Sequence, residues 1–404
     1  MLVFYNPHVD DFLAKPPHFK LLNRRALKKY GFVLDKTLEN DKSLSVVIDG
    51  TISCFIPDRY FKFIPTFARK IISYLEFLLW LKINSIKFPV NYINVKKDNL
   101  ENMLLLMFSY KSATGLAGKN LTALKAFPVI VAHLSHYFVS SQEKAKNLSS
   151  LDNIWLAGDS DISENLYFEK YFSWYQKSFI VLPFSVAPRF NLTTDFQDRK
   201  DLCVAAGSFH NLDEEIPISK YINFRRFFKS NTYHPVRKLI YESRDKCNFI
   251  SSLVSPYRGS VKTNFIKKIF DHFIVSQKAY FKIDLVKEYN SHKFAVIGEE
   301  LSGFPALGAF EAMACGAILI GVPESYKGMG FDFSKCCVTH DGSLEGIFDS
   351  MKHVNSLTDK GESLSESARI SMNKYFNDDA VFEKWDDSFI HLVKMYDLEL
   401  KSKK

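Results

Sequence analysis

The feature that most constrains the fold is an alternation of short apolar runs with helix-like segments, which occurs twice along the chain. In the first half, runs such as "FPVIVAHLSHYFV" (127–139) alternate with predicted helices at 66–83 and 99–110. The second half restarts the alternation with "DLCVAAGSF" and continues through "HKFAVIGEE" and "AILIGV". Strands that alternate with helices build parallel sheets with helices on both faces. The pattern therefore predicts an α/β protein of two doubly wound domains that face each other across a cleft.

Chain length and a change in composition predict the domain boundaries. The 404 residues are too many for one ordinary core and suit two domains of ~200 residues each. A polar stretch punctuated by prolines, "VLPFSVAPRFNLTTDFQDRK" (181–200), separates the two halves. We predict an N-terminal acceptor-side domain at 1–195 and a C-terminal donor-binding domain at 196–375. A helical segment at 376–404 is expected to pack back on the N-terminal domain.

The distribution of charge argues against a nucleic-acid binder. The formal net charge of +8 is modest for this length and is spread along the chain, whereas nucleic-acid binders concentrate it in a strong stripe. One local concentration lies at 55–97, where eight basic residues stand against two acidic ones among many aromatic residues. Either this region rests on anionic lipid headgroups, or it is a partly buried helix with solvated Lys and Arg side chains.

Cysteine usage and hydropathy indicate the cellular compartment in which the protein is expected. The six cysteines show no CxxC pattern, which favours reduced thiols in a reducing compartment. The amino terminus lacks the basic end and apolar run of a signal peptide. The longest apolar stretch, "IISYLEFLLWL", has 11 residues, against the ~20 that a membrane span needs. We expect a cytoplasmic protein, with 55–97 as a peripheral contact to the inner face of a membrane.

The stretch "SGFPALGAFEAMACGAILIGVP" (302–323) carries the strongest chemical signal. Pro305 suits the first turn of a helix and Gly316 its C-terminal cap, while the small residues between them allow close packing. The amino end of such a helix is an anion site. Glu311 lies about six residues inside, ~9 Å from the first turn, where its carboxylate would accept bonds from ribose hydroxyls. The alternative is an ordinary salt-bridged helix residue.

The segment "FEAMACGAILIG" resembles the nucleotide-binding signature of glycosyltransferases with the GT-B fold, above all those of family 4. The resemblance implies two Rossmann-like domains, a nucleotide-sugar donor in the C-terminal half and a ribose contact by Glu311. It departs from the family pattern at Gly303, where family 4 has a second Glu. Glu299 and Glu300 are the nearest carboxylates. Either one of them serves through an altered loop, or the contact to the transferred sugar is missing, which leaves the sugar and the stereochemistry open.

Further residues complete a predicted donor site. In "LVSPYRGSVKTNFIKKIF", Arg258 and Lys262 follow a strand-like run and would face the donor diphosphate. This segment is loosely similar to exostosin-like and family 10 fucosyltransferases; the alternative is a surface helix start. The other predicted donor-binding residues flank the signature segment: Gly303, Phe304, Pro305, Tyr326 and Lys327.

The predicted catalytic residues are His133, Asp159 and Glu300. His133 ends an apolar run and is either a base near the donor sugar or a satisfied core histidine. Asp159 and Asp161 form a D-x-D pattern. This pair of carboxylates offers a catalytic base on the side of the acceptor. In the other major glycosyltransferase fold, GT-A, the same pattern holds a metal ion.

The resemblance implies a glycosyltransferase that moves a sugar from a nucleotide-sugar to a glycan or lipid-linked acceptor, in surface polysaccharide synthesis of the bacterial type. We expect neither a metal nor another cofactor, and no nucleic-acid partner. Two alternatives stay open. One is a metal-dependent GT-A-like transferase that uses Asp159 and Asp161. The other is a non-catalytic module that keeps a degenerate GT-B fold to bind glycan or a partner enzyme, which the missing Glu at Gly303 favours.

Overall fold

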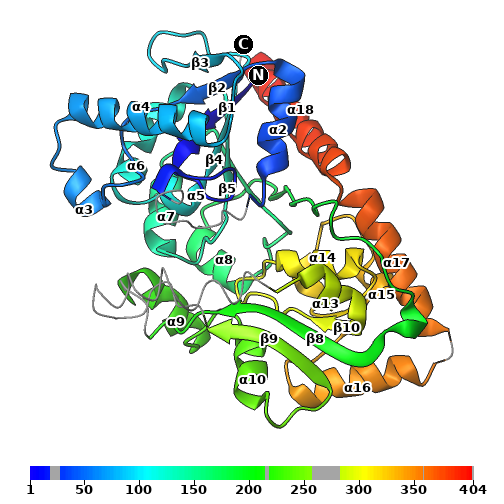
Figure 1. Cartoon of the computed structure of the whole chain (residues 1–404). Coiled ribbons are helices and arrows are strands. Elements are labelled where there is room, and N and C mark those ends of the chain that lie inside the picture. Colours follow the sequence, from blue (N-terminus) through cyan, green and yellow to red (C-terminus); the bar gives the residue numbers. More distant parts are fainter. Residues whose placement is uncertain (19–27, 214–217, 257–282, 358, 403–404) are drawn as a thin grey trace. The chain divides into compact units, whose positions relative to one another are not determined.

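The computed structural model describes residues 1–18, 28–213, 218–256, 283–357 and 359–402 (Figure 1). The chain forms two compact units, each built on one parallel sheet, as the alternation in the sequence predicted. Unit 1 comprises Met1–Asp159, Phe168–Ser185 and Val381–Lys404, and unit 2 comprises Ser160–Tyr167 and Val186–Ala380. The predicted boundary after residue 195 therefore falls inside unit 2. Eight residues from the predicted N-terminal domain, 160–167, also belong to unit 2.

The sheet of unit 1 has seven strands in the order β3-β2-β1-β4-β5-β6-β7. Its strands are β1 (Leu2–Tyr5), β2 (Leu44–Val47), β3 (Val90–Tyr92), β4 (Leu104–Phe108), β5 (Val129–His133), β6 (Ile154–Gly158) and β7 (Ile180–Val181). Every residue of β4 and β5 is buried, as expected for central strands covered on both faces. The strand order reverses between β1 and β4, which makes the carboxyl ends of these two strands the topological switch point of the unit.

The helices of unit 1 confirm one sequence prediction and correct another. They are α2 (Gly31–Asp41), α3 (Asp58–Phe61), α4 (Thr66–Ile83), α5 (Ser109–Ser112), α6 (Gly115–Asn120), α7 (Ser141–Leu148), most of α8 (Leu166–Phe172) and most of α18 (Asp378–Ser402), with the 3₁₀ turns η1 (Pro7–Val9) and η2 (Leu121–Ala126). The helix predicted at 66–83 is α4. The helix predicted at 99–110 is wrong, because Leu104–Phe108 is β4. A five-residue apolar run does not distinguish a strand from a buried helix by periodicity alone.

The C-terminal helix α18 contributes to the core of unit 1. Figure 1 shows α18 beside α2. Trp385 of α18 is fully buried and donates a hydrogen bond from Nε1 to the Pro183 carbonyl at 2.8 Å. Its ring packs against Tyr30, Phe32 and His133, with centroids 5.8 Å away in each case. A large aromatic ring whose N–H is satisfied anchors a helix through buried area and a specific bond.

The sheet of unit 2 has five parallel strands in the order β12-β11-β10-β8-β9. They are β8 (Lys200–Phe209), β9 (Ile250–Pro256), β10 (His292–Val296), β11 (Ile318–Gly321) and β12 (Cys337–Thr339). The described helices are α9 (Ile222–Phe228), α10 (Pro235–Ser243), α13 (Leu285–Ser291), α14 (Leu307–Ala314), α15 (Phe333–Cys336), α16 (Leu344–Asn355) and α17 (Lys360–Tyr375), with the 3₁₀ turns η3 (Phe196–Asp198), η4 (Ile218–Tyr221) and η5 (Pro323–Tyr326). In this unit the order reverses between β8 and β10, so their carboxyl ends mark its switch point.

Across the residues that the model describes, none of the helices combines the length and the apolar character needed to cross a bilayer.

Candidate functional site

The switch point of unit 2 is built from two glycines and one arginine. Gly207 near the end of β8 has φ +124°, and Gly298 just beyond β10 has φ +68°. Arg237 of α10 lies against both: an added Cβ would lie 2.9 Å from its Cζ at Gly207 and 3.1 Å from its Cγ at Gly298. The absence of side chains at these positions therefore gives Arg237 its place at the carboxyl ends of the two strands.

Arg237 connects the two strand ends through its guanidinium. Its Nε donates to the Ile297 carbonyl after β10, and its Nη1 donates to the Ser208 carbonyl in β8 at 2.8 Å. The side chain is buried, with 8% of its surface exposed. A fixed positive charge at a switch point favours an anionic ligand there. Sequence reasoning missed Arg237, because "HPVRKLIYES" reads as an ordinary helix start.

The predicted helix at the signature segment is α14, which starts later than expected. Its N-cap is Ala306, whose side chain offers no cap, and Leu307 is the first helical residue. Pro305 therefore precedes the helix and does not occupy its first turn, which corrects the sequence prediction. Like Phe304, Pro305 is buried. Because no side chain caps the helix, no capping side chain accepts a bond from the N–H groups of its first turn. The amino end of α14 is therefore suited to bind an anion.

Glu311 is half-buried on α14 and points back toward the amino end of the helix. Its Oε2 would lie 3.9 Å from a Cβ added at Gly308, one turn earlier. The same added Cβ would lie 3.1 Å from the Tyr289 hydroxyl and 3.2 Å from Cγ2 of Ile297. Gly308 thus allows α14 to pack closely on the residue that follows β10. This arrangement places the Glu311 carboxylate toward the helix start, as its predicted ribose contact requires.

The carboxyl end of α14 is capped by the chain itself and by a buried arginine. Gly316, predicted as the cap, has φ +78° and donates to the Met313 carbonyl at 2.9 Å, which confirms the prediction. The Gly316 carbonyl accepts from Ser365 Oγ at 2.6 Å. Arg199 donates to the Cys315 carbonyl and also to the Thr194 carbonyl, each at 2.8 Å from Nη2. Both ends of the helix that carries Glu311 are therefore defined by specific residues.

Glu299 ties together the carboxyl ends of three strands. It follows β10, and its Oε1 accepts from Val322 N after β11 at 3.0 Å and from the Tyr326 hydroxyl at 2.9 Å. Its Oε2 lies 3.9 Å from Nε2 of His340, which follows β12. An added Cβ at Gly321 would lie 2.6 Å from Oε1. These contacts give Glu299 a structural role at the strand ends. Tyr326, a predicted donor contact, is buried with its hydroxyl on Glu299, and burial raises its pKa well above the usual value.

Glu300 sits in the turn that leads to α14. It is half-buried and accepts a hydrogen bond from Ser302 Oγ at 2.8 Å. The turn closes through two backbone bonds, from Gly303 N to the Glu300 carbonyl and from Glu300 N to the Phe304 carbonyl. Of the two carboxylates that precede Gly303, Glu299 therefore joins the strand ends, while Glu300 takes part in the turn before α14.

The geometry at Gly303 disfavours any side chain at this position. Gly303 has φ +92°, a conformation that side chains rarely adopt. An added Cβ would lie 2.8 Å from Nδ2 of Asn165 and 3.3 Å from Cγ2 of Ile162. The Gly303 carbonyl also accepts from Ser160 Oγ at 3.3 Å. Residues 160–165 therefore cover this position in unit 2 and exclude a glutamate.

The aspartates of the D-x-D pattern are engaged separately. Asp159 is buried in unit 1 and accepts from Lys29 Nζ at 2.6 Å and from the Tyr30 hydroxyl at 2.8 Å. Asp161, in unit 2, accepts from Ser163 N at 2.9 Å and from Ser163 Oγ at 2.6 Å. Neither belongs to a metal-ligand cluster within the described part of the chain. The arrangement argues against a shared metal ion, and Asp159, 1% exposed, offers little surface to an acceptor.

Lys327, predicted to touch the donor, follows η5 and is exposed. Its Nζ lies 2.6 Å from Oε2 of Glu164, and its carbonyl accepts from Asp161 N at 2.8 Å. Lys327 thus helps to attach residues 160–167 to the rest of unit 2. The two predicted phosphate ligands, Arg258 and Lys262, lie outside the described residues.

His133 occupies the core of unit 1 and not a surface. Its ring is fully buried, stacks on Trp385 at an interplanar angle of 10° and places Nε2 3.2 Å from the Leu182 carbonyl. Burial lowers its pKa to about 4, although the Asp159 carboxylate raises it. A neutral, inaccessible ring argues against the predicted catalytic role, since a base must reach the proton that it removes.

Comparison with solved structures identifies the fold. Sucrose-phosphate synthase from Thermosynechococcus elongatus is similar with a TM-score of 0.50 and 12% identity, over 98% of this chain and 99% of that one. HepE from Anabaena, solved in complex with UDP, is similar with a TM-score of 0.50 and 10% identity, over 96% and 99%. No protein-family model matches the sequence, and no curated protein matches it significantly. The chain has the GT-B fold, which confirms the predicted fold class and excludes the GT-A alternative.

Proposed function

We propose that the protein is a glycosyltransferase that binds a nucleotide-sugar donor on unit 2. The observation that carries the proposal is the Glu311 carboxylate, which points toward the uncapped start of α14 beside the β8–β10 switch point. A diphosphate at the helix start would leave its ribose within reach of Glu311. Two proteins with the same fold support this choice of ligand class, since one is a sucrose-phosphate synthase and the other was solved in complex with UDP. The family 4 signature in "FEAMACG" supports it further.

Catalysis in this proposal rests on stabilising the departing diphosphate. The start of α14 supplies oriented N–H groups and a partial positive charge, and Arg237 supplies a fixed cation at the switch point. Charges that are already in place where negative charge develops lower the barrier without reorganisation during the reaction. We therefore propose transfer that needs no metal ion at the donor. Glu300 is our candidate for the contact to the transferred sugar in place of the residue missing at Gly303.

A nucleotide panel tests the donor site directly. Purified full-length protein is titrated calorimetrically with UDP, GDP, CDP and ADP, first without added metal and then with Mn²⁺. We expect one diphosphate to bind without added metal, at roughly micromolar affinity. If none of the nucleotides binds, the result would contradict the donor site and favour a non-catalytic module that keeps the GT-B fold. Binding that strictly needs Mn²⁺ would contradict the metal-free mechanism.

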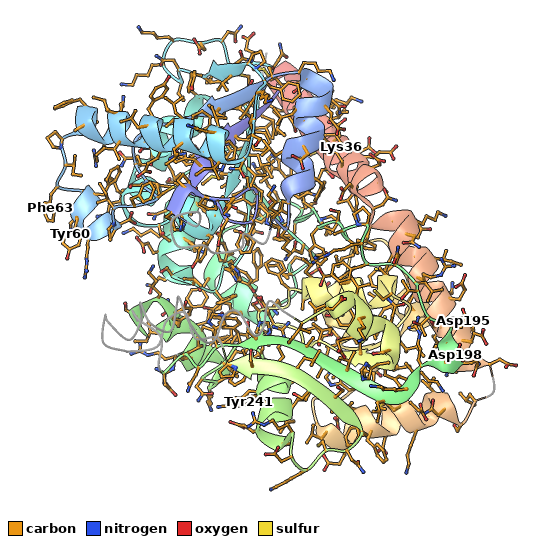
Figure 2. The ribbon with its side chains drawn as sticks, in the orientation of Figure 1. Lys36, Tyr60, Phe63, Asp195, Asp198 and Tyr241 are labelled. Carbon is orange, nitrogen blue, oxygen red and sulfur yellow. The ribbon has the colours of Figure 1, made fainter. Side chains whose placement is uncertain are left out.

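We propose that the acceptor is a lipid-linked glycan. The surface of α3 and α4 would attach the protein to the membrane that holds this acceptor. Five large apolar residues are strongly exposed there: Tyr60 (56%), Phe63 (78%), Phe67 (70%), Ile71 (55%) and Leu75 (57%). Figure 2 labels Tyr60 and Phe63, which lie on the outer side of α3 and the turn after it. We call these five residues the aromatic-basic surface, together with the exposed basic residues beside them, Arg59, Lys62 and Lys70.

The two faces of α4 account for this exposure. Ser73, Glu76, Phe77 and Trp80 are buried against unit 1, while Phe67, Ile71 and Leu75 share the opposite face. Among the charged residues of 55–90 whose side chains are exposed, Asp58 is the one acid. A helix that shows an apolar stripe beside basic residues binds the interface of an anionic bilayer. We therefore propose peripheral attachment through this surface, in keeping with an acceptor embedded in the membrane and a role in surface polysaccharide synthesis.

Vesicle binding separates this proposal from an ordinary solvated helix. The double variant Phe63→Ser/Phe67→Ser is expected to bind vesicles containing phosphatidylglycerol roughly 100-fold more weakly than the wild type, because two aromatic rings no longer enter the interface. The measurement is co-sedimentation at several vesicle concentrations. The control is Ile370→Ser/Ile390→Ser, which removes two exposed apolar side chains elsewhere (50% and 44% exposed). Equal binding by both double variants, or no vesicle binding by the wild type, would contradict the proposal.

A further inference from the structure

A fully buried histidine in unit 1 lacks hydrogen-bond partners. His8 lies in η1, directly after β1, where Asn6 at φ 45° turns the chain. None of its surface is exposed, and neither Nδ1 nor Nε2 has a hydrogen-bond partner. Burial of an unpaired polar ring costs free energy, so such a group calls for an explanation.

Two other potential metal ligands lie beside His8. Cys54 is in the loop after β2, and Glu76 is on the buried face of α4. The nearest ligand atoms of the three residues lie within 4.8 Å of one another, and His8 Nε2 is 3.9 Å from Glu76 Oε2. In a tetrahedral zinc site with bonds of ~2.0–2.3 Å, ligand atoms are about 3.3–3.8 Å apart. A contraction of about 1.5 Å or less would therefore bring all three into coordination distance of one ion.

We infer that His8, Cys54 and Glu76 form a binding site for a Zn²⁺ ion or a similar divalent transition metal. One imidazole nitrogen, one sulfur and one carboxylate oxygen suit zinc, whereas Mg²⁺ and Ca²⁺ prefer oxygen ligands throughout. Three protein ligands leave the fourth position to water or another small ligand. The site is independent of the proposed donor site in unit 2, and it departs from the expectation, drawn from the sequence, that the protein holds no metal.

Neighbouring bonds already orient the carboxylate. Glu76 Oε2 accepts from Cys54 N at 2.7 Å, and Oε1 accepts from Ser53 Oγ. Ser73, one turn before Glu76 on α4, donates to the Ile52 carbonyl at 2.8 Å. These bonds hold the Cys54 loop against α4 without using the His8 ring. Hydrogen bonds of this kind set the direction of metal ligands. The Cys54 thiol already donates to the His8 carbonyl at 3.1 Å, and a bound ion would add a link from the His8 ring to this loop and helix.

Cobalt spectroscopy tests the site on the full-length protein. After removal of metal with a chelator, Co²⁺ is titrated while absorbance is recorded in the visible and near-ultraviolet. We expect about one equivalent to give d–d bands of a tetrahedral site together with a thiolate-to-cobalt charge-transfer band. Zn²⁺ should then displace Co²⁺ and raise the midpoint of thermal unfolding. A wild-type protein that takes up no stoichiometric Co²⁺, or shows no thiolate band, would overturn the inference.

Variants identify the ligands. Cys54→Ser is expected to abolish the charge-transfer band, and His8→Phe to weaken Co²⁺ binding at least ~100-fold. Cys247→Ser is the matched control, since it removes a half-buried thiol in unit 2 and should leave the band unchanged. Circular dichroism checks that each variant is folded. Glu76→Gln serves as a further variant, because its single amide oxygen keeps the bond from Cys54 N or the bond from Ser53 Oγ while its affinity for metal falls. Metal bound equally by all variants is adventitious and would overturn the site.

Discussion

Glu311→Gln is expected to weaken binding of the donor's nucleoside diphosphate by roughly 10- to 100-fold, with the fold unchanged. The glutamine keeps the size of the side chain but loses the charge that strengthens bonds from ribose hydroxyls. Hydrogen bonds to a charged group contribute about 1.5–3 kcal/mol, which corresponds to this change in affinity. The measurement is calorimetric titration of the wild type and the variant with the diphosphate that the nucleotide panel identifies.

The control for this variant is Glu345→Gln, which neutralises an exposed carboxylate on α16 of the same unit. It should leave the affinity within twofold of the wild type, about 0.4 kcal/mol. A Glu311→Gln protein that binds the diphosphate as tightly as the control would show that Glu311 does not contact the ribose. The donor would then have to be located elsewhere on unit 2.

Arg199→Met is expected to lower the free energy of unfolding by about 2–4 kcal/mol. Arg199 is 4% exposed and donates from Nε and Nη2 to the Thr194 and Cys315 carbonyls. Methionine fills part of the volume but leaves both carbonyls without this donor, and each buried acceptor left unpaired costs about 1–3 kcal/mol. Urea unfolding monitored by circular dichroism provides the measurement, with each transition fitted separately because a chain of two units need not unfold in one step.

The matched control is Arg189→Met, which replaces an exposed arginine of the same unit. A surface substitution of this kind changes stability by about 0.5 kcal/mol or less. Because Arg199 caps the end of α14, we also expect its loss to weaken diphosphate binding through the position of Glu311. An Arg199→Met protein as stable as the control would mean that water replaces the guanidinium at the two carbonyls.

The local sequence was sufficient to predict a helix or a cap wherever the structure depends on residues that are neighbours along the chain. The helix predicted at 66–83 is α4, an 18-residue helix whose buried residues recur at helical spacing. Gly316 was predicted as the cap of α14 because a left-handed residue after a helix favours glycine. The segment around Leu104–Phe108 was predicted wrongly, because its state depends on pairing with β1 and β5, which lie far away in the sequence.

The candidate site divides in the same way. Glu311 was predicted from its segment and from the family resemblance of that segment, whereas Arg237 was found only when β8, β10 and α10 were brought together. The sequence left open which of Glu299 and Glu300 contacts the transferred sugar. In the structure, Val322 and Tyr326 engage Glu299, and Glu300 stays in its turn. His133 was predicted to be either a base or a core histidine, and in the structure its ring stacks on Trp385 of α18 in the core of unit 1.

The sequence by itself determined the α/β class, the division into two halves and the segment that carries Glu311, because periodicity, capping and short motifs act over a few residues. The tertiary structure alone decided which polar groups are buried, which are paired and which meet. His8 and Cys54 are 46 residues apart and Cys54 and Glu76 are 22 apart, yet they share one cluster. Such contacts arise from the order of strands in a sheet and the side on which each helix packs, which no local pattern encodes.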